Sequence, residues 1–272
     1  MKANENFIKK GSEFYDLVKL VSEKNGYSTR RRGTLPSKIK TIDDESLSNI
    51  LKEIDIAVDE KDKSDLIQYF QLRSDKLNGI EKMLMNRNDA KTLYKKEFRL
   101  KKPKTPPLFN KQKNEKRHES YLACLVQIQA EHILGYGNFN NDPQSLAYFK
   151  NSNGKLLKCF SRRFDGLINS VKNPKIVWEI KEYYGTTTFG SRVADGVYET
   201  LLDGYEFKAL EAKGQKIYHY LFVDDHFTWW ELGKSYLCRI FDMMHTGHVD
   251  RVYFGKQVVT EFPNDLREHL NT

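Results

Sequence analysis

The chain has 272 residues, of which 39% are hydrophobic and 12% aromatic, enough to bury the core of one large domain or two smaller ones. No stretch approaches the roughly 20 apolar residues of a membrane span, and residues 1–6 lack the apolar core of a signal peptide, so we expect a cytoplasmic protein. The three cysteines show no CxxC spacing, so the sequence indicates neither a disulfide framework nor a zinc site.

Helical patterns fill the region between residues 42 and 90. Apolar residues recur at helical spacing behind Thr41, a candidate N-cap, and again after Ser64. These patterns predict a helical N-terminal region over residues 1–100 that binds DNA or a partner, although they match no specific helix-turn-helix.

A basic block follows these helices. Eleven Lys or Arg residues and only two acids lie between residues 91 and 118, and the formal net charge of the whole chain is +8. Pro103, Pro106 and Pro107 argue against one continuous helix here. The block is typical either of an arm that faces phosphates or of a solvated linker, and we assign residues 101–117 to this segment.

The pattern changes after the block, and residues 118–272 form a separate predicted domain. A helix over 118–134 is followed by strands over 156–168 and 175–183, a helix over 190–213 and a strand over 217–223. A helix over 234–244 then leads to two short strand-like segments, 251–255 and 258–262. This α/β order predicts a mixed sheet, in which the long crossover from 181 to 217 brings a parallel strand beside the first pair.

Two charged residues interrupt the strand over 175–183. Glu179 and Lys181 share one face of this strand, roughly 7 Å apart at the backbone for a rise of about 3.3 Å per residue. If the preceding strand pairs with it as a hairpin, Asp165 comes to lie beside Glu179, with Arg162 on the opposite side. Two carboxylates and an amine at one strand end suit a Mg²⁺ ion and an attacking water, and the natural target is a phosphodiester.

The pattern FDGLI…IVWEIK resembles the active site of the PD-(D/E)xK nucleases, a superfamily that includes many type II restriction endonucleases. The resemblance covers roughly residues 118–255 and implies a restriction-endonuclease-like mixed sheet flanked by helices. It also implies that Asp165 and Glu179 bind Mg²⁺ while Lys181 contacts the nucleophilic water.

The resemblance has one further implication and one departure. The family often adds an acidic residue from the first core helix, for which Glu119 is the better candidate and Glu131 the other. Phe164 precedes Asp165, where the family pattern has proline, which weakens the match.

Other readings of the same residues remain open. The spacing ExK recurs at Glu206–Lys208, where Asp195 could supply a second carboxylate if that segment were a strand, but residues 191–203 favour a helix. Glu179 and Lys181 could also form an exposed structural pair on a half-solvated strand.

The sequence thus predicts a Mg²⁺-dependent endodeoxyribonuclease, a phosphodiester hydrolase of the type II restriction class that acts on double-stranded DNA as a homodimer. The alternatives are a non-catalytic DNA-binding or structural module of the same fold and a repair or RNA nuclease with the same chemistry. No glycine-rich nucleotide loop is found, so no nucleotide cofactor is expected. Arg192 lies in a loop that either meets phosphates or only caps a helix. The predicted DNA contacts are Arg30, Arg31, Arg32, Lys95, Lys96, Lys101, Lys102, Lys104 and Arg192.

Overall fold

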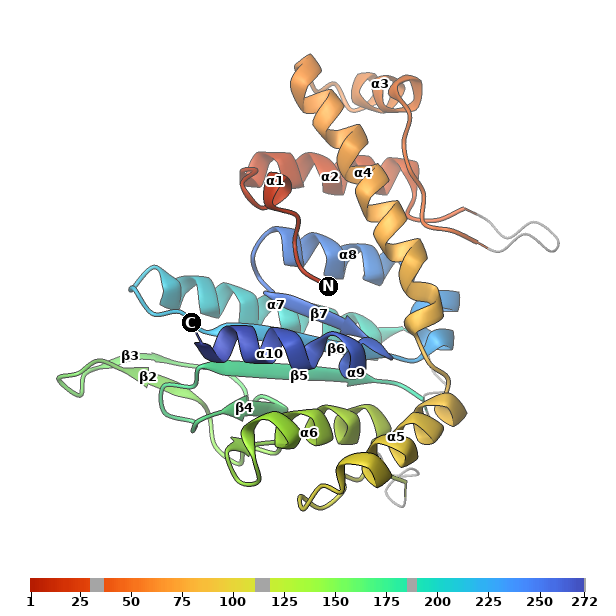
Figure 1. Cartoon of the computed structure of the whole chain (residues 1–272). Coiled ribbons are helices and arrows are strands. Elements are labelled where there is room, and N and C mark those ends of the chain that lie inside the picture. Colours follow the sequence, from red (N-terminus) through yellow and green to blue (C-terminus); the bar gives the residue numbers. More distant parts are fainter. Residues whose placement is uncertain (30–36, 111–117, 185–189, 272) are drawn as a thin grey trace.

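A computed structural model describes residues 1–29, 37–110, 118–184 and 190–271 (Figure 1). The N-terminal region is helical, as predicted, and its helices are α1 (Glu5–Ile8), α2 (Ser12–Asn25), α3 (Asp44–Glu53) and α4 (Glu60–Ile80). Helix α3 begins after Asp43, whose side chain accepts from the backbone N–H of Ser46, so the predicted cap at Thr41 is wrong by two residues. In Figure 1 these helices pack above α8 (Lys234–His245) and away from α6 (Tyr121–Leu134).

The centre of the molecule is a mixed sheet of five strands in the order β1-β4-β5-β6-β7. Strand β4 pairs antiparallel with both β1 and β5, whereas β6 pairs in parallel with both β5 and β7. The predicted hairpin-like pairing and the predicted parallel crossover are therefore confirmed. The strands are β1 (Phe139–Asn140), β4 (Gly166–Ile168), β5 (Ile176–Glu182), β6 (Tyr218–Asp224) and β7 (Arg251–Phe254).

Helices cover both faces of the sheet (Figure 1). Trp178 and Tyr220 belong to a buried cluster with α6 and the C-terminal helices α9 (Gln257–Thr260) and α10 (Phe262–Asn271). On the opposite face, Leu221 and Val223 pack with α7 (Ser191–Glu211), α8 and the N-terminal helices. This alternation places the polar positions of β5 beneath α7.

The segment predicted as one strand over 156–168 is two strands. Only β4 joins the central sheet, while β3 (Leu156–Cys159) pairs with β2 (Tyr148–Lys150) in a separate hairpin. Phe160 and Phe164 lie between β3 and β4, and both are buried with their ring centroids 5.3 Å apart. The chain therefore bends where a straight strand was expected, because these two rings share one small core.

The strand predicted over 258–262 is also wrong, since this segment forms α9 and the start of α10. Val258, Phe262 and Leu266 are buried at a spacing of four residues, which is the helical period. A short apolar run does not distinguish a strand from a buried helix by its periodicity alone. Among the described helices, none combines the length and the apolar character needed to cross a bilayer.

Candidate functional site

The pairing of β4 with β5 brings Asp165 and Glu179 to adjacent positions. Gly166 pairs with Trp178, so continuing this register by one residue sets Asp165 opposite Glu179. The backbone N–H of Asp165 donates to the Trp178 carbonyl (3.1 Å), and the N–H of Ile180 donates to Asp165 Oδ2 (2.8 Å). These bonds fix Asp165 on the edge of β5.

Gly166 permits this close approach. A Cβ atom built on Gly166 would lie 2.1 Å from the indole of Trp178, closer than any side chain tolerates. The strand that carries Asp165 therefore passes directly over the Trp178 ring, and only glycine fits this position.

The Glu179 carboxylate is fully buried, and the Lys181 amine lies 3.2 Å from its Oε2 atom. Burial alone would raise the pKa of Glu179, but Lys181 and Arg162 outweigh it and hold this pKa below its ordinary value. Burial would lower the pKa of Lys181, yet the carboxylates of Glu179 and Asp165 raise it overall. The pair is therefore a charged carboxylate and a charged amine at neutral pH.

Arg162 completes the site and was not predicted to do so. Its Nη2 atom lies 2.8 Å from Glu179 Oε2, and its Nη1 atom lies 2.7 Å from Asp203 Oδ2 on α7. A straight strand would have turned Arg162 away from Asp165, so the bend between β3 and β4 is what directs the guanidinium into the site.

Helix α7 supplies two further carboxylates. Glu199 lies 3.4 Å from the Lys181 amine and 3.5 Å from Arg162, and Asp203 is fully buried one helical turn further on. Burial and repulsion from Glu179 raise the pKa of Asp203 to about 7, although Arg162 lowers it. The spacing of these two acids on a predicted helix was a usable signal, but only the packing of α7 shows which face meets β5.

Asp165 is exposed as a residue, but its carboxylate lies against β5. Loss of solvent around the carboxylate and repulsion from Glu179 raise the pKa of Asp165 to about 6, against the opposing effect of Lys181. The site thus gathers four carboxylates, those of Asp165, Glu179, Glu199 and Asp203, around two cations, Arg162 and Lys181, which is an excess of acidic groups.

This excess suits a divalent cation. Glu179 Oε1 and Asp203 Oδ1 are buried, and no group within the described ranges donates a hydrogen bond to either atom. Mg²⁺ keeps several waters and commonly binds proteins through only one or two carboxylates, so Glu179 and Asp165 are sufficient as its protein ligands. Where the chain is described, no cluster of three or more His, Cys, Asp or Glu residues forms a closed metal site.

The other acidic candidates lie elsewhere. Among the described contacts none joins Glu119 to Asp165, Glu179 or Lys181, and Glu131 instead accepts from the backbone N–H groups of Lys104 and Thr105. Glu182, at the end of β5, accepts from the backbone N–H groups of Leu122 and Ala123 at the start of α6. Burial raises its pKa to about 7 despite these bonds.

The second ExK pattern lies within α7, as the sequence favoured. Glu206 forms an ion pair with Lys158 (2.5 Å) and accepts from the hydroxyl of Ser161 (2.9 Å). It therefore anchors the bend after β3, whereas Asp195 is exposed near the start of the helix.

The basic block begins as helix α5 (Arg87–Lys101), which ends before Pro103. Lys95 and Lys96 are exposed beside an open depression of about 560 Å³, and Lys102 and Lys104 are exposed just beyond the helix. Lys101 differs, because its amine is engaged by Gln129 and by Glu97. Arg192 is exposed at the start of α7, whereas Arg30, Arg31 and Arg32 lie outside the described residues.

Two family models match separate parts of the chain. Residues 1–80 match the family model described as Domain of unknown function (DUF7690), and residues 85–269 match the one described as Domain of unknown function (DUF7687). No curated protein and no solved structure matches the chain. The two family models meet between residues 80 and 85, while the boundaries predicted at residues 100 and 117 stay predictions. Since the second match spans more than half of the chain, the chain belongs to the DUF7687 family.

Proposed function

We propose that this protein is a Mg²⁺-dependent endodeoxyribonuclease with a restriction-endonuclease-like fold. The observation that carries the proposal is the pairing of Asp165 with Glu179 across β4 and β5, with Lys181 two residues further on the same strand face. The unpartnered Glu179 Oε1 atom supports a cation at this position. The resemblance of the same residues to the PD-(D/E)xK pattern gives the reaction class.

The residues of the site divide the chemistry among them. Asp165 and Glu179 would hold Mg²⁺, which supplies charge stabilisation at a phosphodiester and lowers the pKa of a bound water. Lys181 has a raised pKa and stays protonated at neutral pH, so it orients the attacking water as a hydrogen-bond donor instead of removing its proton. Glu199 holds the Lys181 amine from the α7 side.

Double-stranded DNA is the proposed substrate. Helix α5 presents exposed lysines on one surface, and lysines that contact phosphates supply affinity without reading sequence. One active site per chain cuts one strand, so cleavage of both strands favours a homodimer with two-fold symmetry matched to a palindromic site. This arrangement is that of a type II restriction enzyme acting in the cytoplasm.

A direct experiment is to incubate the pure chain with mixed genomic DNA and Mg²⁺ and to map the ends of the fragments. Recurrent ends at one short sequence, absent when EDTA replaces Mg²⁺, are the expected result. Fragments with random ends would support a nuclease but would contradict a sequence-specific restriction enzyme. If the folded protein leaves DNA intact with every divalent cation tested, the proposal is overturned. If it cleaves RNA alone, the substrate is RNA and not DNA.

One observation favours a second function. Arg162 engages one oxygen each of Glu179 and Asp203, so the chain itself supplies a counter-charge to these carboxylates, as expected for a DNA-binding module that keeps the fold without chemistry. Such a module would bind duplex DNA equally well with Mg²⁺ and with EDTA and would never cleave it.

A further inference from the structure

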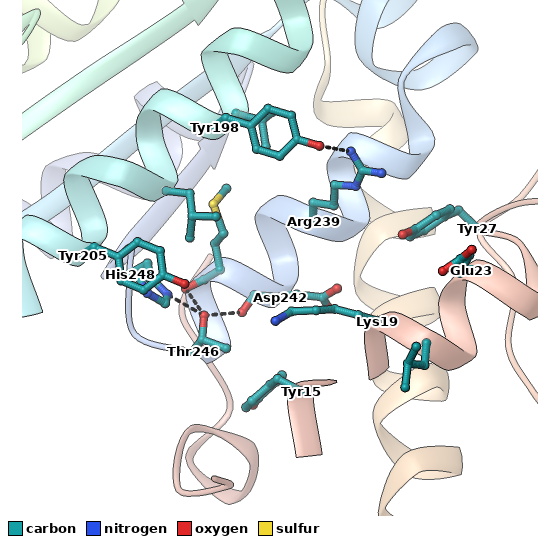
Figure 2. Close-up of a pocket in the computed structure, with 14 residues that line it drawn as sticks. Tyr15, Lys19, Glu23, Tyr27, Tyr198, Tyr205, Arg239, Asp242, Thr246 and His248 are labelled. Atoms are coloured by element: carbon teal, nitrogen blue, oxygen red, sulfur yellow. Dashed lines mark hydrogen bonds between the residues drawn. The ribbon is translucent and has the colours of Figure 1, made fainter. Parts of the chain in front are cut away.

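A cavity of about 520 Å³ lies between α2, α7 and α8 (Figure 2). Its volume is within the range of small-molecule sites, which occur preferentially at the junctions of domains. The N-terminal helices, which match one family model, meet here the α/β region that matches the other. This cavity is separate from the carboxylate site, which lies on the side of α7 that faces β5.

Aromatic rings form much of the cavity wall. Tyr15 and Tyr27 come from the N-terminal region, and Tyr198 and Tyr205 come from α7. More than half of the surface of Tyr198 and of Tyr205 is exposed (52% and 57%), so both rings remain open to an incoming group. Flat, partly exposed rings in a pocket suit an aromatic ligand that stacks on them.

Arg239 gives the cavity a positive charge. Its guanidinium donates to the Tyr198 hydroxyl (2.9 Å; Figure 2) and lies over the rings of Tyr27 and Tyr236 at 5.8 and 5.2 Å. Arg239 also hydrogen-bonds Tyr27, and within the described chain no ion pair joins it to a carboxylate, so the N–H groups that remain can bind an anion.

The acids near Arg239 do not cancel this charge. Asp242 is engaged by Arg73 (3.1 Å) and by the Tyr69 hydroxyl (2.7 Å). Lys19 and Glu23 bring opposite charges to the rim. The cavity therefore offers one guanidinium beside a group of aromatic rings, which is the arrangement that binds a planar group carrying an anion.

His248 adds an unsatisfied hydrogen-bond acceptor to the wall. Thr246 Oγ1 donates its hydrogen to the backbone carbonyls of Asp242 and Met243. The bond between Thr246 Oγ1 and His248 Nδ1 (2.8 Å) must then take its hydrogen from the histidine, which leaves Nε2 of the neutral ring unprotonated. His248 is 7% exposed, and no described group donates to Nε2, which lies beside the Tyr205 ring. This nitrogen is itself buried, so it is a feature of the wall and not an open contact for a ligand.

We propose that this cavity binds a nucleotide unit, with the base among the tyrosines and the phosphate at Arg239. A pocket of this kind needs no glycine-rich phosphate loop, so it is compatible with the sequence, and it does not depend on the chain being a nuclease. The unit could be a free nucleotide or a base turned out of a DNA strand, and both present the same chemistry.

The cavity shares α7 with the carboxylate site. Tyr198 is adjacent to Glu199, and Tyr205 follows Asp203 by two residues, so two turns of one helix present rings to the cavity and carboxylates to β5. A bound nucleotide would therefore contact the helix that positions Asp203.

The test is calorimetric titration of the full chain in EDTA, which prevents cleavage. The probes are the four nucleoside monophosphates, adenosine, inorganic phosphate, and short single-stranded and duplex oligonucleotides. Tyr205→Leu removes one ring, and Tyr136→Leu is its control because Tyr136 is equally exposed outside the cavity (60%). Arg239→Gln removes the charge, with Arg267→Gln on α10 as its control.

Tyr205→Leu and Arg239→Gln should each weaken binding by about 10-fold, whereas both control variants should bind as the wild type does. Adenosine has no phosphate, so its affinity should fall with Tyr205→Leu but should not change with Arg239→Gln. Binding of monophosphates identifies a free nucleotide, and binding of oligonucleotides alone identifies a base from a strand. If neither class of probe binds, or if Tyr205→Leu leaves every affinity unchanged, the proposal is overturned. Binding of inorganic phosphate at the same affinity would also overturn it, because the site would then hold only an anion.

Discussion

Arg162 and Glu179 are joined by a charged hydrogen bond of 2.8 Å, although one lies in the bend after β3 and the other in the middle of β5. The second arm of the same guanidinium reaches Asp203 on α7. A single guanidinium thus bonds to two buried carboxylates and holds the bend, the strand and the helix together. In the nuclease that we propose, Arg162 competes with the cation for Glu179.

Replacing Arg162 by Gln should destabilise the metal-free protein by about 3 kcal/mol or more, because Glu179 and Asp203 lose the partner that offsets their burial. Mg²⁺ should restore more stability to this variant than to the wild type, since the cation then meets uncompensated carboxylates. Thermal melting with and without Mg²⁺ measures both effects.

Arg163→Gln is the matched control for that experiment, because Arg163 is the exposed neighbour of Arg162. Its melting temperature should stay within the error of the wild type. Equal melting of the Arg162 and Arg163 variants would show that the ion pairs of Arg162 carry no net stability.

Asp203 predicts a dependence of stability on pH. Its pKa is about 7 in the folded chain and close to the ordinary value of 3.8 when unfolded, so the folded state binds the extra proton between these values. The contribution of Asp203 to the stability of the metal-free protein should therefore fall as the pH rises from about 4 to 7. The lowered pKa of Glu179 acts only below about pH 4.5, at the lower edge of this window.

Asp203→Asn should remove this contribution. It leaves those of Asp165 and Glu182, whose raised pKa values act in the same direction, and those of the buried His219 and His248, whose lowered pKa values act in the opposite one. Chemical denaturation at pH 5, 6, 7 and 8 in EDTA measures the profile. Parallel profiles for the wild type and Asp203→Asn between pH 5 and 7 would contradict the assigned protonation of Asp203.

Gly166→Ala should destabilise the fold by about 2 kcal/mol, since the added methyl group overlaps the Trp178 indole. It should also displace Asp165 and so weaken the response of the melting temperature to Mg²⁺. Gly79→Ala is the control, because its Cβ meets no atom within 4 Å and alanine favours the helix α4 by about 0.5–1 kcal/mol. Two variants of equal stability would show that the close approach of β4 to Trp178 is not required.

The exposed lysines of the basic block should set the salt dependence of DNA binding. Replacing Lys95, Lys96, Lys102 and Lys104 by Gln should weaken binding to all duplexes alike and reduce the salt slope by about 0.9 for each DNA phosphate that no longer meets a lysine. Lys101→Gln should affect stability more than the slope, because that amine is engaged within the protein. An unchanged slope after four substitutions would identify the block as a solvated segment. Fluorescence anisotropy at several salt concentrations gives the slope.

Local patterns were sufficient to predict the centre of the site. Strand alternation places Glu179 and Lys181 on one face, and the short connection between β4 and β5 leaves few registers, so Asp165 was predicted beside Glu179. Local apolar patterns likewise predicted the strands β5 and β6 and the helix α7.

The positions of Arg162 and Asp203 in the site depend on long-range packing, which local sequence patterns do not predict. The bend that directs Arg162 to Glu179 arises because Phe160 and Phe164 share a core with Phe207 of α7, at 5.1 and 5.7 Å between ring centroids. The role of Asp203 depends on which face of α7 packs against β5. Neither relationship has a signature in the local order of residues.

The most direct test of the proposed nuclease is the rate of DNA cleavage by the variants Glu179→Gln and Lys181→Ala. DNA binding and thermal melting of both variants are measured in parallel. Glu179→Gln removes the charge that holds the cation, and Lys181→Ala removes the donor to the attacking water, so each should lower the rate of plasmid cleavage by about 100-fold or more. Both folded variants should still bind short duplexes, because affinity depends on phosphate contacts elsewhere. Folded variants that cut plasmid at the wild-type rate would contradict the account and leave Glu179 and Lys181 as a structural ion pair.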